Sequence, residues 1–545
     1  MNGGEVLVET LLAWGVDTAF SVPGESYLPI LAAMQRHRNR IRLVTPRHES
    51  GVTFAAEAYG KIARRPAAAF VSRGPGATNA SIGIHTAMQD STPLVLFVGH
   101  VPTASIGREA FQEIDYHRMY GAVAKAVLEP RSARQIGEVT ARALALSVSG
   151  RPGPIVVVLP KDLIEGDAGD AAVREPTIRP IAGPEFDAVK QAAALIDQAK
   201  RPLVIAGEMV SFERATPALL AFAEASGAGI CAAYRRQDTF PNDHPAYCGH
   251  FEINRVGFQD QAWAECDLVI AAGARLDGIT TQDFAMIRPD QTLIHIFPDR
   301  DVLARWRSTI PLASDVLPAL EALAGAVSPP GDERLAWRDR VHQAYRSFAT
   351  PGEVRIHGAI DMAKVVTAVD RIAPDDSVVL CDSGTFARWV HRYYRFGLPG
   401  TQAGPMSGAM GYAVPGALGT CLAKPDAPSI AFVGDGGFLM TGQELTAAVQ
   451  HELPVKIVLC DNNAWGSILV SQQKKFGEEG EFATRLKSPD FAAVARGYGL
   501  PAWTVASTEA FEPAFREALA HPGPTLIHLK LDDRDISPFA ADGKV

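Results

Sequence analysis

Several features that mark particular protein classes are missing from this chain of 545 residues. No two of its six cysteines are close enough for a CxxC pair, which argues against a zinc ribbon or a disulfide scaffold and favours buried free thiols. No apolar run approaches the roughly 18 to 20 residues that span a bilayer. The N-terminal segment MNGGEVLVETLLAWG carries two acids and predicts an amphipathic helix instead of a signal peptide. We therefore expect a cytoplasmic protein with no membrane partner.

Excess positive charge and repetitive sequence are missing too. Lys and Arg number 52 against 61 Asp and Glu, a formal net charge of −9, which argues against binding nucleic acid through bulk positive charge. No short-period repeat is visible, so a solenoid is excluded. The composition, 47% hydrophobic and 21% charged, is typical of soluble globular proteins. At roughly 150 residues per domain, the length predicts three or four domains.

Turn-forming residues are abundant, with 48 glycines and 38 prolines spread along the chain. Between them, short apolar runs alternate with helical patterns, which predicts an α/β fold with doubly wound parallel sheets covered by helices on both faces. The predicted strands are Ile41–Thr45, Ala67–Ser72, Leu94–Val98, Ile155–Leu159, Leu203–Ala206, Leu268–Ala271, Leu293–Phe297, Val378–Cys381, Ser429–Val433, Val455–Cys460 and Leu526–Leu531. Proline-rich stretches at 166–186 and 325–357 suggest linkers. They divide the chain into three predicted domains, 1–165, 186–325 and 357–545.

The strongest chemical signal lies in the last domain. Gly434, Asp435, Gly436 and Gly437 follow one predicted strand, and Asn462 follows the next, 27 residues after Asp435. Because parallel sheets bind ligands at the carboxyl ends of their strands, these side chains should meet at one edge. A carboxylate and an amide oxygen suit magnesium, and the glycines allow backbone N–H groups to approach phosphate oxygens. A tight turn would also explain the glycines alone, but not the asparagine at this spacing.

These motifs resemble the thiamine-diphosphate enzymes of the acetolactate synthase and pyruvate decarboxylase superfamily. The resemblance covers the whole chain and implies a pyrimidine-binding, a central and a diphosphate-binding domain, in that order. It implies that Asp435, Asn462 and the backbone carbonyl of Ala464 bind magnesium beside thiamine diphosphate. Asp461 stands where the family usually has the first asparagine of the motif.

The first domain supplies a second match, in the segment TPRHESGVTFAAEAYGK at 45–61. The resemblance implies that Glu49 hydrogen-bonds the aminopyrimidine ring and activates the cofactor, so that the protein contributes position and a proton. An acid favoured by the dipole at a helix N-terminus is the alternative.

Further segments extend the resemblance on both sides of the cofactor. Gln112 lies in an FQE sequence like that of acetolactate synthases, where the glutamine reaches the reactive side. Met410 matches the bulky apolar residue beneath the bent cofactor, with core filling as the alternative. The other implied cofactor-binding residues are Gly74, Gly76, Ser383, Thr385, Gly408, Gly434, Gly436 and Gly437. Glu444 follows Thr441 by three positions, which predicts a capping box there.

Other positions depart from the synthase pattern. Glu25 replaces a glycine and would be an acid/base group for substrate steps, or else a surface acid. Ile279 stands where synthases place an arginine that binds the acceptor 2-oxoacid, and Phe297 stands where the flavin-binding strand carries an acid. The second change makes FAD binding doubtful.

The resemblance implies a thiamine-diphosphate- and magnesium-dependent 2-oxoacid decarboxylase or carboligase that works through a carbanion/enamine intermediate. It also implies a homodimer or homotetramer with active sites between subunits. The alternatives are a C–C lyase of the same superfamily and a non-catalytic, cofactor-binding paralogue or regulatory subunit. Retention of Glu49 argues against the paralogue, because binding alone needs no activating acid. The substrate, apart from being a small 2-oxo compound, is not given by these motifs.

Overall fold

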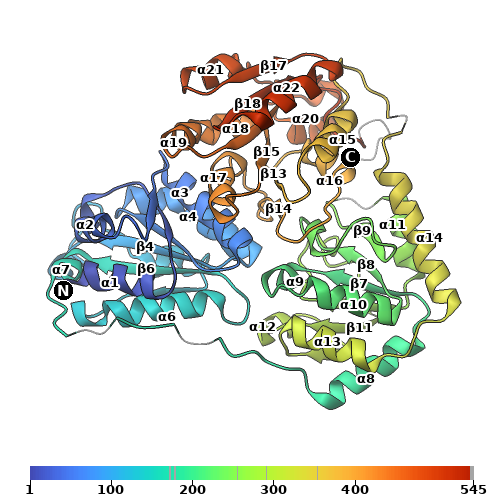
Figure 1. The fold of residues 1–545 in the computed structure, drawn as a ribbon, viewed down its shortest axis with the longest axis horizontal. Coiled ribbons are helices and arrows are strands. Elements are labelled where there is room, and N and C mark those ends of the chain that lie inside the picture. Colours follow the sequence, from blue (N-terminus) through green and yellow to red (C-terminus); the bar gives the residue numbers. More distant parts are fainter. Residues whose placement is uncertain (171–172, 177–178, 254–255, 290, 353, 540–545) are drawn as a thin grey trace.

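The computed structural model describes residues 1–539 except 171–172, 177–178, 254–255, 290 and 353. The described residues form three six-stranded sheets, one in each third of the chain (Figure 1). Every strand pairing within them is parallel. Helices separate most of the successive strands, so the predicted fold of three doubly wound α/β domains is confirmed.

The N-terminal sheet has the strand order β2-β1-β3-β4-β6-β5. Its strands are β1 (Thr18–Ser21), β2 (Arg42–Val44), β3 (Ala67–Val71), β4 (Leu94–His100), β5 (Ala126–Leu128) and β6 (Pro154–Pro160). Its helices are α1 (Gly3–Ala13), α2 (Leu28–Arg36), α3 (Glu49–Ala63), α4 (Pro75–Asp90), α5 (Tyr116–Tyr120), α6 (Ile136–Val148) and α7 (Lys161–Glu165). Helix α1 is the predicted N-terminal helix, and Asn2 and Glu5 form its capping box.

The central sheet has the order β12-β11-β10-β7-β8-β9. Its strands are β7 (Pro202–Ala206), β8 (Gly229–Ala232), β9 (Tyr247–His250), β10 (Leu268–Ala272), β11 (Thr292–Ile296) and β12 (Ile310–Leu312). Its helices are α8 (Phe186–Gln198), α9 (Glu208–Phe212), α10 (Thr216–Ser226), α11 (Gly257–Glu265), α12 (Arg300–Leu303), α13 (Val316–Ala326) and α14 (Asp332–Ala349). Helix α14 lies within the second predicted linker, yet Trp337 and Val341 on it pack into the core of this sheet.

The C-terminal sheet has the order β14-β13-β15-β16-β18-β17. Its strands are β13 (Val378–Cys381), β14 (Gln402–Ala403), β15 (Ser429–Gly434), β16 (Val455–Asp461), β17 (Ala502–Val505) and β18 (Thr525–Lys530). Its helices are α15 (Met362–Ile372), α16 (Ala387–Tyr393), α17 (Ala413–Ala423), α18 (Asp435–Thr441), α19 (Leu445–Gln450), α20 (Gly466–Phe476), α21 (Phe491–Gly497) and α22 (Thr508–Ala520). All six cysteines are free and buried, as predicted.

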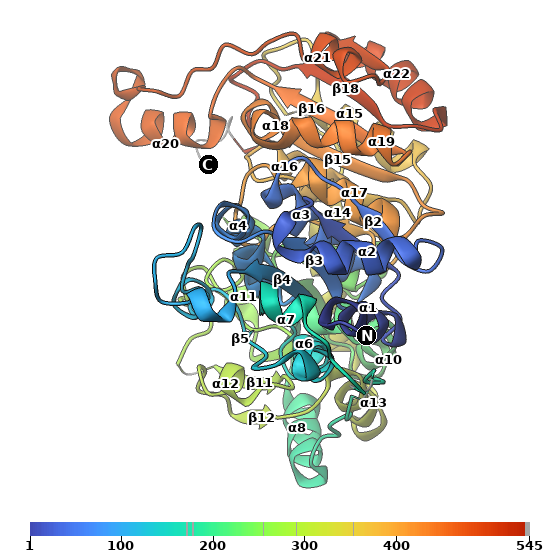
Figure 2. The same cartoon turned by 90° about the vertical axis from the view of Figure 1, so that its left-hand side faces the viewer.

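The N-terminal and C-terminal sheets share one continuous apolar core, which helices α3 and α17 build between them (Figure 2). The two helices approach so closely that a Cβ atom on Gly419 would lie 2.0 Å from the carbonyl oxygen of Ala55. Since no side chain fits in that space, glycine is required there. The central sheet has separate cores on its two faces.

A buried ionic cluster ties all three domains together. Lys61 pairs with Asp90 at 2.8 Å and with Glu57 at 3.1 Å, and Arg236 of the central domain pairs with Asp90 at 3.2 Å. The Tyr412 hydroxyl of the C-terminal domain donates to Glu57 at 2.6 Å. Buried charges are tolerated when they are paired and hydrogen-bonded, as these are.

Among the helices that the structure describes, none combines the length and apolar character needed to cross a bilayer.

Candidate active site

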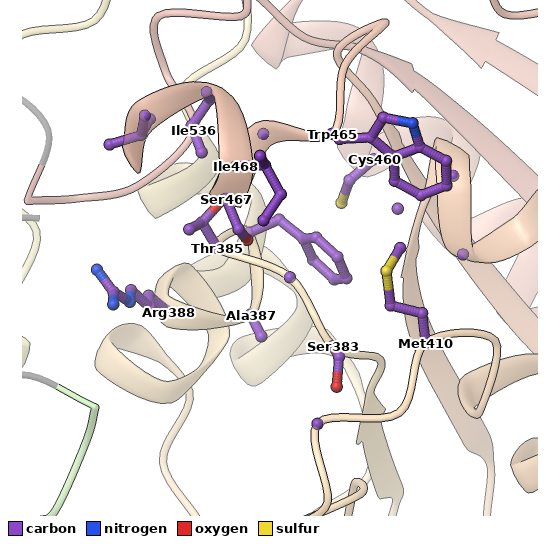
Figure 3. Close-up of a pocket in the computed structure, with 18 of the residues that line it drawn as sticks. Ser383, Thr385, Ala387, Arg388, Met410, Cys460, Trp465, Ser467, Ile468 and Ile536 are labelled. Atoms are coloured by element: carbon purple, nitrogen blue, oxygen red, sulfur yellow. The ribbon is translucent and has the colours of Figure 1, made fainter. Parts of the chain in front are cut away.

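A cavity of about 580 Å³ opens where the central and C-terminal domains meet (Figure 3). That volume is in the range of ligand pockets. Met410 and Trp465 lie on one side of it, and Ile468 and Ile536 lie on the other. The loops after β13, β15 and β16 contribute most of its wall, so it occupies the carboxyl edge of the sheet, where parallel sheets bind ligands.

The proposed magnesium ligands meet at this edge. Strands β15 and β16 are neighbours, with Gly434 paired to Cys460, so Asp435 and Asn462 follow at adjacent strand ends. The Asp435 carboxylate accepts the backbone N–H groups of Gly436 (2.8 Å) and Ala464 (3.2 Å). Burial, together with the nearby charge of Asp461, raises the pKa of Asp435 to about 6. A bound cation would offset that cost of burying the charge.

The donor set fits a hard cation with oxygen ligands. Asp435, the Asn462 amide and the Ala464 carbonyl would supply three oxygens, and substrate phosphates usually complete such a shell. Within the described ranges, no group of three or more His, Cys, Asp or Glu side chains is arranged to hold a metal ion. The proposed set contains one carboxylate, so it does not depend on such a group.

The glycines of the motif allow close packing under the cavity. A Cβ atom on Gly436 would lie 2.2 Å from the Trp465 ring, and one on Gly437 would lie 2.8 Å from the Asp382 carboxylate. Asp382, which the sequence analysis did not single out, accepts the backbone N–H of Gly411 at 3.0 Å and so holds the loop that carries Met410. Burial raises the pKa of Asp382 to about 6.

Four of the candidate cofactor-binding residues line the cavity: Ser383, Thr385, Gly408 and Met410. The Ser383 hydroxyl is buried and has no hydrogen-bond partner among the described residues. An orphaned buried hydroxyl is costly unless a ligand satisfies it. Gly408 adopts φ +71°, a backbone conformation that favours glycine.

The candidate residues of the N-terminal domain form a second cluster. Glu49 is the first residue of α3, and its carboxylate accepts the Asn79 side-chain amide at 2.9 Å. A Cβ atom on Gly76 would lie 3.3 Å from that carboxylate, and one on Gly74 would lie 2.7 Å from the Cβ of Gln112. Gln112 has φ +66°, a strained conformation for a residue other than glycine. Four of the predicted residues are therefore neighbours.

Glu25 lies at the rim of the same cluster. Its exposed carboxylate is 3.3 Å from the Arg73 guanidinium, and Arg73 directly precedes Gly74. None of these N-terminal candidates is among the residues that line the cavity. Within one chain, the predicted site residues thus fall into two separate sets, one on each outer domain.

Comparison with known proteins shows which kind of domain carries each set. Three models describing thiamine pyrophosphate enzymes match the chain: the N-terminal TPP binding domain at residues 1–119, the central domain at 189–323 and the C-terminal TPP binding domain at 382–529. The chain belongs to the thiamine pyrophosphate enzyme family. It is a thiamine-pyrophosphate-dependent enzyme of the decarboxylase and carboligase kind. Thiamine pyrophosphate and thiamine diphosphate are the same compound.

Several acetolactate synthase large subunits are similar along nearly their whole length. The chain is 31% identical to the one from Parasynechococcus marenigrum, over 97% of this chain and 87% of that protein. It is 30% identical to the isozyme 1 large subunit of Escherichia coli, over 99% and 96%. A probable large subunit from Methanocaldococcus jannaschii is 29% identical over 100% and 94%.

The structure accounts for one departure from the motif of the thiamine pyrophosphate enzymes. Asp461 is fully buried, and its carboxylate pairs with His528 at 2.8 Å and with Lys530 at 2.9 Å. Although burial alone would raise it, hydrogen bonds from these two residues hold the pKa of Asp461 well below its usual range. Asp461 thus stays ionised, and its charge is compensated by His528 and Lys530 on the neighbouring strand β18. It directly precedes the proposed metal ligand Asn462.

Two departures lie in the central domain. Ile279 lines the cavity, so an apolar side chain occupies the wall where the sequence comparison placed the arginine of synthases. Phe297 is fully buried in the core of the central sheet. That the chain does not bind FAD stays a prediction. The roles of the individual site residues stay predictions too.

The predicted capping box at Thr441 and Glu444 is wrong. The Thr441 hydroxyl donates to the Gly411 carbonyl at 2.7 Å and caps no helix. The Glu444 carboxylate instead accepts the backbone N–H groups of Arg47 (2.8 Å) and His48 (3.0 Å) at the start of α3. Burial raises the pKa of Glu444 to about 7. A contact between domains, which local spacing does not reveal, thus replaced a local one.

Proposed function

We propose that this chain is a thiamine-diphosphate- and magnesium-dependent enzyme that decarboxylates a 2-oxoacid, transfers the fragment to an acceptor, or does both. One observation carries the proposal: a buried carboxylate, Asp435, and an orphaned buried hydroxyl, Ser383, face one cavity large enough for the cofactor. The similarity to acetolactate synthases supports the class of reaction. Glu25 and Ile279 stand where the synthases have a glycine and the arginine that binds the acceptor. We therefore expect any acceptor of this enzyme to differ from that of the synthases.

The candidate residues of the C-terminal domain have distinct roles in this proposal. Asp435, Asn462 and the Ala464 carbonyl would hold the magnesium ion, and Gly434, Gly436 and Gly437 would let the backbone approach the diphosphate. Ser383 and Thr385 would donate to phosphate oxygens, and Gly408 and Met410 would position the pyrimidine side. When bound, thiamine diphosphate supplies the nucleophilic carbon and accepts the electron pair that decarboxylation releases.

The proposal also includes a site built between two subunits. The metal-binding residues and Glu49 lie in separate clusters of one chain, and the cavity has no wall from the N-terminal domain. A second copy would bring Glu49, Gly74, Gly76 and Gln112, with Glu25 at the rim, to the open side of the cavity. Isologous contacts of this kind produce a dimer with two equivalent sites, and two dimers could form a tetramer.

Binding measurements and a substrate screen test the proposal. The purified protein should bind thiamine diphosphate in the presence of Mg²⁺ and bind it much more weakly with EDTA, as calorimetry would measure. A panel of 2-oxoacids should then reveal at least one that releases carbon dioxide. No binding of thiamine diphosphate with Mg²⁺ present would contradict the proposal. Flavin content, read from the absorbance of the same preparation, tests the doubt about FAD.

A further inference from the structure

A histidine and a carboxylate form a buried pair in the wall of the cavity. His391 on α16 and Glu252, just after β9, both line the cavity, although neither was singled out in the sequence. Nδ1 of His391 is hydrogen-bonded to the Glu252 carboxylate. The pair joins the C-terminal domain to the central domain, and none of the cofactor roles proposed above uses it.

Surrounding groups fix the pair in place. The His391 side chain is 4% exposed, and the Gln237 side-chain amide donates to the His391 backbone carbonyl at 2.8 Å. Nε2 of His250 lies 3.6 Å from the same Glu252 carboxylate. The Tyr234 ring packs against the imidazole in a T-shaped arrangement. An imidazole held in this way presents one nitrogen in one direction.

The surroundings also set the protonation of the pair. Although burial would raise it, the two histidines hold the pKa of Glu252 well below its usual range. Burial lowers the pKa of His391, and the nearby charges of Arg235 and His250 act in the same direction while Glu252 opposes them. Arg388, one turn earlier on α16, also lines the cavity. We therefore assign an ionised Glu252 that accepts Nδ1–H from a neutral imidazole.

In that tautomer the second ring nitrogen, Nε2, carries a lone pair. It has no hydrogen-bond partner within the part of the chain that the structure describes. Since His391 lines the cavity, Nε2 is the polar atom that it can offer to a ligand there. A neutral imidazole backed by a carboxylate is the arrangement of a general base.

We infer that His391, oriented by Glu252, is a general base for a hydroxyl group of the reacting substrate. The inference rests on the proposed function and adds a proton-accepting residue on the substrate side of the site, distinct from Glu49. When a product carbonyl forms from that hydroxyl, the O–H bond breaks and its proton moves to Nε2. The oxygen's electron pair forms the C=O double bond, and the bond to the departing group breaks with its electron pair leaving on that group. The imidazolium then returns the proton to solvent.

Substitution by asparagine separates the base from the structural role. In His391→Asn the side-chain amide nitrogen takes the place of Nδ1 and keeps the bond to Glu252, but no atom replaces Nε2. We expect kcat for the best 2-oxoacid of the screen to fall by about 100-fold or more, with the affinity for thiamine diphosphate and the melting temperature near wild type. The matched control is His342→Asn, at a buried histidine outside the cavity that is bonded to the Tyr247 carbonyl at 2.8 Å. It should keep wild-type kcat.

The pH profile is the second readout. Wild-type kcat should fall on the acid side as His391 takes up a proton, and His391→Asn should lack this limb. Glu252→Gln should move the limb to lower pH, because the lost negative charge no longer stabilises the imidazolium. Near-normal kcat in His391→Asn, or an unchanged acid limb, would overturn the inference.

A measurement without turnover separates this inference from the proposed function. In ¹⁵N-histidine spectra of the holoenzyme at pH 7, assigned with His391→Asn, the Nε2 signal of His391 should be that of an unprotonated nitrogen. A protonated Nε2 there would overturn the inference even in an active enzyme. Failure of the wild type to bind thiamine diphosphate with Mg²⁺ would overturn the proposed function, whatever the state of His391.

Discussion

The Glu444 carboxylate accepts the backbone N–H of His48 at 3.0 Å. A side chain of the C-terminal domain therefore provides the hydrogen-bond acceptor for the residue that caps the N-terminus of α3. The next residue along α3 is Glu49, the proposed activating acid. A Cβ atom on Gly51 would lie 2.5 Å from Glu444, which explains why the helix has glycine there. The contact therefore fixes the position of Glu49 by packing one domain of the chain on another.

Replacing Glu444 should destabilise the protein. Glu444→Ala removes the buried acceptor of two part-buried N–H groups, those of Arg47 and His48, and should lower the free energy of unfolding by about 2–4 kcal/mol. Glu444→Gln keeps one acceptor oxygen and should cost less. Urea unfolding followed by tryptophan fluorescence measures both. Glu479→Ala, at an exposed position of the same domain, is the control and should change stability little. Equal losses in Glu444→Ala and Glu479→Ala would contradict the contact.

Mixing two inactive variants tests the site between subunits. Glu49→Gln should lower kcat by about 100-fold or more because the activating acid is lost. Asp435→Ala should abolish joint binding of Mg²⁺ and thiamine diphosphate. In a mixed dimer one site would contain both changes and the other neither. Unfolding and refolding the two variants together should therefore restore about a quarter of wild-type activity.

Two controls make that experiment decisive. Each variant refolded alone should stay inactive, and co-refolded wild type should recover fully. If the mixture is no more active than the separate variants while mixed dimers are present by mass spectrometry, each site is built from one chain. Unchanged cofactor affinity in Asp435→Ala would contradict the metal assignment independently.

The close approach of Gly436 to Trp465 gives a third prediction. A Cβ atom at residue 436 would lie 2.2 Å from the indole ring, so Gly436→Ala should displace Trp465 or the strand end beside Asp435. We expect the affinity for thiamine diphosphate to fall at least tenfold, as measured by calorimetry with saturating Mg²⁺. Gly497→Ala, where the added methyl would meet no atom within 4 Å, should bind as wild type does. Equal affinities in the two variants would show that the space under the cavity is not tight.

How far the sequence predicts this structure depends on the length of each element. The predicted strands all occur, because runs such as Leu94–Val98 are long, apolar and buried on both faces. The strands that were missed, such as β14 (Gln402–Ala403) and β12 (Ile310–Leu312), have two to four residues and lack such a run. Their partners in the sheet, and not their own sequence, make them strands.

The same distinction applies to the candidate site. Asp435 and Asn462 follow the ends of two neighbouring strands. Their spacing in the sequence was therefore enough to predict that they lie close together. Glu252 and His391 are 139 residues apart in different domains, and neither belongs to a motif. Local spacing even misled at Glu444, whose partner lies in another domain. Contacts made by domain packing leave no periodic trace in the sequence.

The buried imidazole of His295 should make stability depend on pH. His295 on β11 is fully buried, its Nε2–H donates to the Ala274 carbonyl at 2.9 Å, and burial lowers its pKa to about 4. In the unfolded chain the pKa is about 6.5, so between pH 6.5 and pH 4 the unfolded state binds the extra proton. The contribution of the neutral imidazole to stability is therefore complete above pH 6.5 and is lost as pH falls toward 4.

His295→Gln removes this titration while keeping a side-chain donor for the Ala274 carbonyl. Between pH 7 and pH 5 the wild type should lose about 2 kcal/mol more free energy of unfolding than the variant. Urea unfolding at each pH, followed by the fluorescence of the buried central-domain residues Trp263 and Trp337, measures the difference. His117→Gln, at an exposed histidine, should keep the wild-type slope. A constant difference between wild type and His295→Gln over this range would mean that His295 takes up its proton equally in both states.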